Sequence, residues 1–198
     1  MNRFVIMTIG KTHSGKTTFA RALEQELTNS LVIDQDNHAE FINANYKNLR
    51  PKQGPNTFKY AITQTIVDYA VEQTDFHLIL CNSNMDRKGR VERLKHFREM
   101  GFICILVHFD IPEPILRERV AVSRRSKTIF RTASTFEEVL MRQIAGGIVE
   151  PTEDEADYLF KIKSSDEVES VIHRLVTIAQ SNSRGQGGQG DGSTGTGI

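Results

Sequence analysis

Residues 10–17 read G-K-T-H-S-G-K-T, a complete fit to the phosphate-loop pattern G-x-x-x-x-G-K-[ST]. The residues before the loop, F-V-I-M-T-I at 4–9, are apolar and predict a buried strand. The residues after it, T-F-A-R-A-L-E-Q-E-L at 18–27, predict an amphipathic helix. Strand, glycine loop and helix is the arrangement in which this motif binds phosphate. The stretch therefore predicts an α/β fold and a site for a nucleoside triphosphate.

Each residue type in the loop has a physical reason to contact phosphate. Gly10 and Gly15 lack a Cβ, so the backbone can turn tightly and bring its N–H groups close to phosphate oxygens. We expect Lys16 to reach the β- and γ-phosphates and the Thr17 hydroxyl to bind Mg²⁺. The predicted nucleotide contacts are Gly10, Lys11, Thr12, His13, Ser14, Gly15, Lys16, Thr17 and Thr18. His13 either takes part in catalysis or fills a tolerant position.

The length and composition favour one folded domain followed by a tail. A chain of 198 residues is typical of a single α/β domain, which we place at residues 1–180. Residues 181–198 are rich in Gly, Ser and Gln, cannot bury a core, and are expected to be disordered. The formal net charge is zero, which argues against a protein that coats nucleic acid.

The charges are nevertheless segregated along the chain. Residues 117–131 carry six Arg or Lys and one acid, whereas residues 150–157 carry five acids and no base. Cys81 and Cys104 each lie in an apolar run, which indicates buried free thiols rather than metal ligands. No signal peptide or membrane-spanning stretch is recognisable, so a cytoplasmic location is the default expectation.

Apolar runs alternate with helical patterns, as in a parallel sheet covered by helices. The predicted strands are Phe4–Ile9, Leu31–Asp34, His77–Cys81, Phe102–Phe109 and Tyr158–Ile162. The predicted helices are Lys16–Thr28, Asn56–Gln73, Arg87–Met100, Glu113–Ser123, Thr135–Ile144 and Asp166–Gln180. Ligands bind at the carboxyl ends of the strands in such sheets, so the polar residues that follow each strand are the candidate site.

Asp36, just after the second predicted strand, is the candidate general base. A carboxylate there can accept the proton of a hydroxyl group during phosphoryl transfer. Alternatively, Asp34 or Asp36 caps a helix that runs through residues 39–42, since Asp is a common N-cap residue. The two roles do not exclude each other.

The basic segment at residues 117–127 has two interpretations. It can be a lid that closes arginines over the transferred phosphate and excludes water, or a solvated basic face. As a lid, it would supply Arg124 and Arg125 to catalysis and Arg119 to the adenine or the adjacent phosphates. The loop at Tyr46–Asn56 lies near the expected acceptor cleft, where its basic residues either suit an anionic substrate or are simply solvated.

The chain resembles the small P-loop kinases that include polynucleotide 5′-kinase domains, zeta-toxin-like proteins and gluconate kinase, often described as AAA-type ATP-binding proteins. The stretches that carry the resemblance are T-I-G-K-T-H-S-G-K-T-T at 8–18, V-I-D-Q-D-N at 32–37, L-C-N-S-N at 80–84, F-D-I-P-E-P-I-L-R-E-R at 109–119 and E-A-D-Y-L-F-K-I at 155–162. The resemblance implies a three-layer fold whose parallel five-stranded sheet has the order 2-3-1-4-5, with helices on both faces.

The resemblance also implies ATP and Mg²⁺ as ligands and Asp36 as the base. Two positions depart from the family's pattern. Asn82 stands where relatives carry an Asp that orients the metal, and Ala39 stands where polynucleotide kinases carry an Arg for the acceptor phosphate. Asn82 can still orient a metal-bound water but brings no charge.

The main hypothesis is therefore a kinase that transfers the γ-phosphate of ATP to a hydroxyl group of a small molecule or of a nucleotide. Nucleic acid enters only as an acceptor, and no membrane partner is expected. The alternatives are a nucleotide-binding regulatory protein and an ATPase with little phosphotransferase activity. The sequence does not indicate the acceptor or the oligomeric state.

Overall fold

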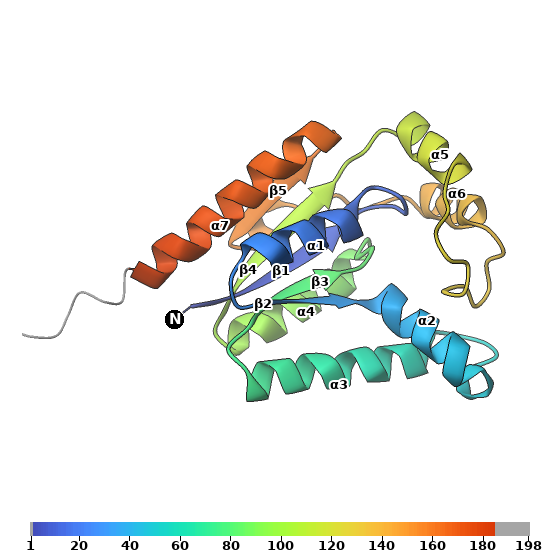
Figure 1. Cartoon of the computed structure of the whole chain (residues 1–198), viewed down its shortest axis with the longest axis horizontal. Coiled ribbons are helices and arrows are strands. Elements are labelled where there is room, and N and C mark those ends of the chain that lie inside the picture. Colours follow the sequence, from blue (N-terminus) through green and yellow to red (C-terminus); the bar gives the residue numbers. More distant parts are fainter. Residues whose placement is uncertain (1, 185–198) are drawn as a thin grey trace, which may run out of the picture.

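Five parallel strands form one sheet in the order β2-β3-β1-β4-β5, which confirms the expected topology (Figure 1). The computed structural model describes residues 2–184. The strands are β1 (Arg3–Ile9), β2 (Ser30–Asp34), β3 (His77–Cys81), β4 (Phe102–Phe109) and β5 (Tyr158–Ile162). Asp34 lies opposite Cys81, and Ile9 lies opposite His108. Neighbouring strands thus end at one edge of the sheet, where the segments that follow them meet.

Both faces of the sheet are buried under helices, which makes a three-layer structure. The first face packs against α1 (Lys16–Glu26) and α7 (Val168–Arg184), and the second against α3 (Thr57–Gln73) and α4 (Arg87–Glu99) (Figure 1). Side chains of β1 alternate between the layers: Phe4 and Ile6 belong to the first core, Val5 and Met7 to the second. Burial on both faces explains why this strand is a continuous apolar run.

Three further helices lie beyond the carboxyl ends of the strands rather than on the sheet (Figure 1). They are α2 (Gln35–Asn45), α5 (Glu113–Ala121) and α6 (Phe136–Gly146). Short 3-10 helices are found at η1 (Lys47–Leu49), η2 (Glu153–Glu155) and η3 (Ser165–Glu167). The helices α2, α5 and α6 therefore gather at the edge where a ligand is expected.

The last helix is longer than predicted. It continues to Arg184, past the expected end at Gln180 and into the stretch 181–198 that was expected to be disordered. The Ser181 hydroxyl donates to the carbonyl of Thr177, and Asn182 Nδ2 donates to that of Ile178, so these polar side chains bond back to the helix. Residues 185–198, the rest of that predicted tail, lie outside the described residues.

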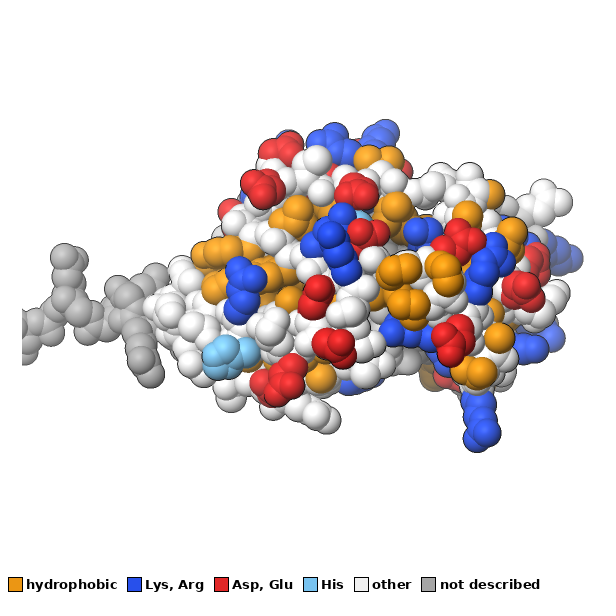
Figure 2. Space-filling model, turned by 90° about the horizontal axis from the view of Figure 1, so that it is seen from above, with side chains coloured by type: hydrophobic (Ala, Val, Ile, Leu, Met, Phe, Trp, Pro, Cys, Tyr) orange, Lys and Arg blue, Asp and Glu red, His pale blue; other side chains and the backbone are white. Residues whose placement is uncertain are grey.

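The surface charges, the two cysteines and the hydropathy of the helices can each be compared with what the sequence predicts. Figure 2 shows acidic and basic side chains interspersed over one face of the molecule. Cys81 and Cys104 are buried free cysteines, and burial raises the pKa of each thiol to about 11. Between residues 2 and 184, no helix has both the length and the hydropathy needed to cross a membrane.

Candidate functional site

The loop between β1 and α1 depends on its two glycines. Gly10 has φ 149°, and a Cβ there would lie 2.9 Å from the carbonyl oxygen of Phe109. Gly15 has φ 101° and is the N-cap residue of α1. The loop is tied to the neighbouring strand connection by the Gly10 N–H, which donates to the Ser83 carbonyl at 3.0 Å. Only residues without a Cβ bring the backbone this close to the sheet and then directly into a helix N-terminus.

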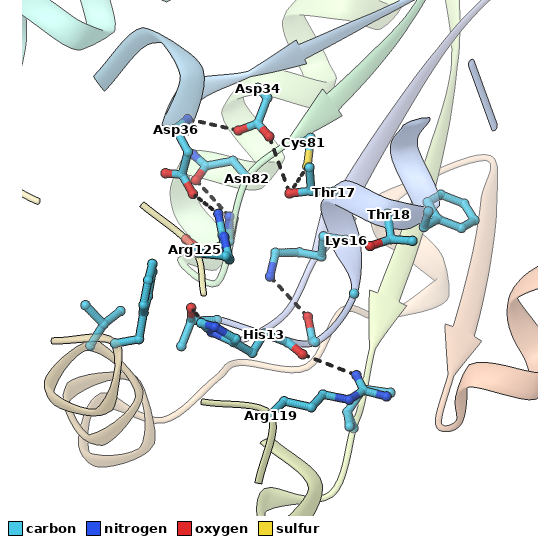
Figure 3. Close-up of a pocket in the computed structure, with 18 of the residues that line it drawn as sticks. His13, Lys16, Thr17, Thr18, Asp34, Asp36, Cys81, Asn82, Arg119 and Arg125 are labelled. Atoms are coloured by element: carbon cyan, nitrogen blue, oxygen red, sulfur yellow. Dashed lines mark hydrogen bonds and ion pairs between the residues drawn. The ribbon is translucent and has the colours of Figure 1, made fainter. Parts of the chain in front are cut away.

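Lys16 lies along this loop with its ammonium group turned toward the loop backbone (Figure 3). Nζ donates to the carbonyl of Lys11 at 2.5 Å and to Ser14 Oγ at 3.1 Å. Burial lowers the pKa of Lys16 to about 8, although the nearby carboxylate of Asp36 favours the charged form. The Lys16 ammonium is thus largely desolvated and bonded only to neutral oxygens of the loop, so an anion such as a phosphate would be a stronger partner.

The first turn of α1 contacts a buried acid at the end of β2. Thr17 Oγ1 donates to Asp34 Oδ2 at 3.3 Å and lies 3.6 Å from Cys81 Sγ. Asp34 is 4% exposed, and burial raises its pKa. A hydroxyl and a carboxylate oxygen are ligands that suit Mg²⁺. Asp34 is a site residue outside the set predicted from the sequence, although its place just before a helix and two residues before Asp36 is a usable signal.

Within residues 2–184, no cluster of three or more His, Cys, Asp or Glu side chains could hold a metal ion by itself. In nucleotide sites Mg²⁺ keeps several waters and takes further ligands from phosphates, so a hydroxyl and a carboxylate placed as in Thr17 and Asp34 fit such an ion.

Asp36 is in the first turn of α2 and pairs with Arg125, which belongs to the basic segment at residues 117–127. Arg125 Nη2 lies 3.1 Å from Asp36 Oδ2 (Figure 3). The guanidinium carbon of Arg125 lies over the Phe136 ring, 5.2 Å from its centre. The helix is capped by Asp34, whose Oδ1 accepts the Asp36 N–H at 2.9 Å. Asp34 is therefore the residue that caps the helix, and both Asp34 and Asp36 line the cavity.

The segment from α5 through the loop 122–135 to α6, which we call the lid, packs on the phosphate loop. The His13 ring contacts Ser123 Oγ through Nε2 at 2.7 Å and meets the Phe136 ring edge-on at 4.7 Å. The Thr12 N–H donates to Gln143 Oε1 at 2.7 Å. Burial and neighbouring cations lower the pKa of His13 to about 4, so its imidazole is neutral at physiological pH. His13 therefore acts as a contact between the loop and the lid.

The structure separates the three predicted arginines. Arg119 lines the cavity and donates to the His13 carbonyl at 3.2 Å and to Ser165 Oγ at 2.9 Å. Arg125 also lines the cavity, beside Asp36. Arg124 is exposed and does not line it. The lid thus brings two of these three cations to the site.

Asn82 lines the cavity, but both ends of its amide already have partners. Its Nδ2 donates to Gln35 Oε1 at 2.8 Å, and its Oδ1 accepts the Ser83 N–H at 2.8 Å. Gln35 is itself 4% exposed. In this arrangement Asn82 fixes the start of α2 relative to β3.

These groups surround one cavity of about 780 Å³ at the carboxyl edge of the sheet. Of the site residues predicted from the sequence, the following line this cavity: Thr12, His13, Ser14, Gly15, Lys16, Thr17, Thr18, Asp36, Asn82, Arg119 and Arg125. Gly10 and Lys11 belong to the loop but do not line the cavity. Ile129, Phe130 and Phe136 of the lid add apolar walls on the Asp36 side. The cavity is large enough for a nucleotide together with a second ligand.

Comparison with known proteins agrees with the fold of the chain. The chain is similar to a sugar kinase from Janibacter sp. HTCC2649 (19% identity, 91% of this chain and 95% of that chain, TM-score 0.59). It is also similar to the Mycobacterium tuberculosis APS kinase CysC solved with AMPPNP and APS (16% identity, 90% and 98% covered, TM-score 0.59).

A third similar structure is Chaetomium thermophilum Kti12 in complex with ADP-AlF3 (17% identity, 86% and 96% covered, TM-score 0.59). No curated protein sequence matches the chain. The family model described as "AAA domain" matches residues 5–146, which include the phosphate loop, both acids and the lid. The chain therefore belongs to this AAA domain family and has the fold of the small P-loop kinases.

Proposed function

We propose that this protein is an ATP-dependent phosphotransferase that moves the γ-phosphate of ATP to a hydroxyl group of an acceptor. The observation that carries this proposal is that the phosphate loop, the Asp36 carboxylate and Arg125 of the lid line one cavity. A domain that only binds nucleotide needs the phosphate loop alone. Phosphoryl transfer to an alcohol also requires a carboxylate and a cation beside the transferred phosphate.

Nucleotide binding is assigned to the loop at residues 10–18 and to Arg119. The backbone N–H groups at the start of α1 and the Lys16 ammonium would bind the phosphates. Thr17, with Asp34 behind it, would hold Mg²⁺. The metal, when bound, neutralises charge on the phosphate oxygens during transfer.

Asp36 is assigned as the general base that accepts the acceptor's hydroxyl proton. Its carboxylate is 43% exposed and faces the cavity, so an acceptor can reach it. Arg125, 3.1 Å away, would leave Asp36 for the more highly charged γ-phosphate once ATP is present. That exchange places positive charge where transfer needs it and frees the base at the same time.

A nucleotide-binding regulatory protein or an ATPase with little phosphotransferase activity is the second candidate, favoured by Asn82. Relatives are expected to carry an acid at this position, and here a neutral amide is bound to Gln35 and Ser83. Without that charge, the metal site depends more heavily on Asp34.

The test compares the Asp36→Asn variant with the unaltered protein. ADP release from Mg-ATP is measured with a panel of sugars, nucleosides, small alcohols and 5′-hydroxyl oligonucleotides, and calorimetry measures the Kd of ATP. We expect the variant to lose about 10²–10⁴-fold in acceptor-dependent turnover, because a general base contributes that much. The Kd of ATP should change little.

Asp68→Asn is the matched control, because Asp68 is an exposed acid on α3 whose carboxylate bonds Gln64. Full acceptor-dependent activity in Asp36→Asn would refute the assignment of the base. Tight ATP binding without turnover on any acceptor would favour the regulatory protein.

A further inference from the structure

A smaller cavity, of about 80 Å³, lies on the second face of the sheet. Side chains of α3 and α4, the two helices that cover this face in Figure 1, line it together with residues of β2 and β3. One water-sized group needs about 10–15 Å³ of such volume, so the cavity has room for roughly half a dozen of them. Pockets for nucleotide-sized ligands occupy about 300–1,000 Å³. A ligand of this cavity is therefore a small molecule.

The side-chain amide of Gln35 offers this cavity an N–H donor. Gln35 is 4% exposed, and it lines this cavity but not the larger one. Because Asn82 Oδ1 accepts the Ser83 N–H, Asn82 Nδ2 faces Gln35 and donates to its Oε1 at 2.8 Å. Gln35 Nε2 has no hydrogen-bond partner among the described residues. A nearly buried donor without a protein partner favours a bound molecule that supplies the acceptor.

Arg93 of α4 brings a positive charge to the same cavity. Its side chain is half-buried, and burial lowers its pKa. Between residues 2 and 184, no ion pair or side-chain hydrogen bond includes its guanidinium. The described residues that line the cavity include no Asp or Glu. A partly desolvated guanidinium beside a free amide donor favours a ligand with anionic oxygens.

Much of the remaining wall is apolar. Ile33, Val67, Leu80 and Phe97 are all buried and line the cavity. An inorganic anion would leave these side chains facing water or a void, whereas a short hydrocarbon group would pack against them. A carboxylate on a small apolar body therefore fits the cavity better than phosphate or sulfate does.

The small cavity adjoins the larger one at Asn82, the lining residue that the two share within the described part of the chain. Gln35 stands between Asp34 and Asp36 in the sequence, and both of these acids line the larger cavity. On this side, Gln35 ties the first turn of α2 to the end of β3 through Asn82. A ligand bonded to Nε2 would fix Gln35 at both ends of its amide and would hold this turn more firmly.

We propose that the small cavity is an effector site for a carboxylate with a small apolar body, whose oxygens are bound by Gln35 Nε2 and Arg93. The bound carboxylate would fix the first turn of α2 and so strengthen the binding of Mg-nucleotide beside Asp34. A consequence for turnover rests on the proposed kinase function, whereas the effect on nucleotide binding does not.

The test is a ligand-observed NMR titration of isobutyrate into protein saturated with Mg-AMPPNP, so that the phosphate loop is already occupied. Isobutyramide, which is neutral and has nearly the same shape, and inorganic phosphate are titrated in parallel. We expect isobutyrate to bind about tenfold more tightly than either, the range that a charged hydrogen bond supplies. Calorimetry then measures the Kd of Mg-AMPPNP, which isobutyrate should lower about fivefold relative to sodium chloride at the same ionic strength.

Two variants assign the binding to this cavity. Gln35→Glu keeps an oxygen for Asn82 Nδ2 but replaces the free donor by an acceptor, so it should abolish isobutyrate binding. Arg93→Gln should remove the preference for isobutyrate over isobutyramide, and it keeps the test decisive if Gln35→Glu fails to fold. Lys95→Gln is the matched control, because Lys95 is an exposed cation on the same helix and lines neither cavity.

Equal binding of isobutyrate and isobutyramide, no binding of isobutyrate, or tighter binding of phosphate would overturn the proposal. Binding that survives in both Gln35→Glu and Arg93→Gln, or that is lost equally in Lys95→Gln, would overturn it as well. Isobutyrate binding that leaves the Kd of Mg-AMPPNP unchanged would refute the effector role. A failure to release ADP with any acceptor would count against the kinase function alone, since neither binding measurement depends on turnover.

Discussion

Replacing Lys16 by methionine removes a positive charge that the folded protein holds largely away from water. Burial lowers the pKa of Lys16 from 10.5 to about 8. Each tenfold change in a dissociation constant is about 1.4 kcal/mol, so keeping this ammonium protonated in the folded state costs about 3.5 kcal/mol as an upper limit. The hydrogen bonds to Lys11 and Ser14 are lost in the variant and offset part of the gain. We therefore expect Lys16→Met to raise the free energy of unfolding by about 1–3 kcal/mol at pH 7.

The pH dependence identifies the cause. Between pH 8 and 10.5 the unfolded chain holds a proton on Lys16 that the folded chain has released, so the unaltered protein gains stability as the pH rises. The variant lacks this group, and its advantage should be constant below pH 8 and disappear by about pH 10.5. Guanidinium unfolding at pH 7, 8, 9 and 10, without nucleotide, measures the difference directly. The same variant should lose ATP binding, since the charge that is costly in the empty site is the one that binds phosphate.

Lys52→Met is the control, because its exposed side chain should leave the free energy of unfolding nearly unchanged at every pH. A Lys16→Met protein that is less stable at pH 7 would show that the two hydrogen bonds outweigh desolvation. An advantage that stays the same from pH 7 to pH 10 would refute the assignment to the ammonium charge.

Two further predictions concern backbone and core. Gly10→Ala should lower the free energy of unfolding by about 1–3 kcal/mol and weaken ATP binding. The added Cβ would lie 2.9 Å from the Phe109 carbonyl oxygen, and the backbone φ of 149° disfavours a side chain. Thermal unfolding measures the loss, with Gly146→Ala as the control because no atom lies within 4 Å of the Cβ added there. Arg90→Met should lower the free energy of unfolding, measured in guanidinium, by about 3 kcal/mol, because it removes the 2.9 Å ion pair to the fully buried Glu155 side chain. The double variant Arg90→Met/Glu155→Gln should recover part of that free energy.

The phosphate loop could be predicted from the sequence because its determinants are local. Two glycines, a lysine and a threonine at fixed spacing, preceded by an apolar run and followed by a helix, occur within 24 residues at 4–27. The order of the sheet is different: it depends on which strands pair, and the expectation came from the resemblance to P-loop kinases rather than from any residue pattern. That order is confirmed.

The roles of neighbouring polar residues could not be read in the same way. Asp34 and Asp36 are two positions apart and both line the cavity, and only the direction of the turn into α2 decides that Asp34 rather than Asp36 caps the helix. Arg124 and Arg125 are adjacent in a loop without periodicity, so the sequence gives no reason for one to point inward. The Arg131 side chain donates to the carbonyl of Gly54, which lies 77 positions away in the sequence, and only the folded chain brings these two groups together.

The bond from the Thr12 N–H to Gln143 has a consequence for the kinetics of nucleotide exchange. While the lid is closed, one phosphate-loop amide already has an acceptor supplied by the protein itself. A triphosphate that used the Thr12 N–H would have to compete with the Gln143 side chain. Association should therefore be slower than diffusion permits, and small free anions, which cannot displace the lid, should have short residence times on the loop.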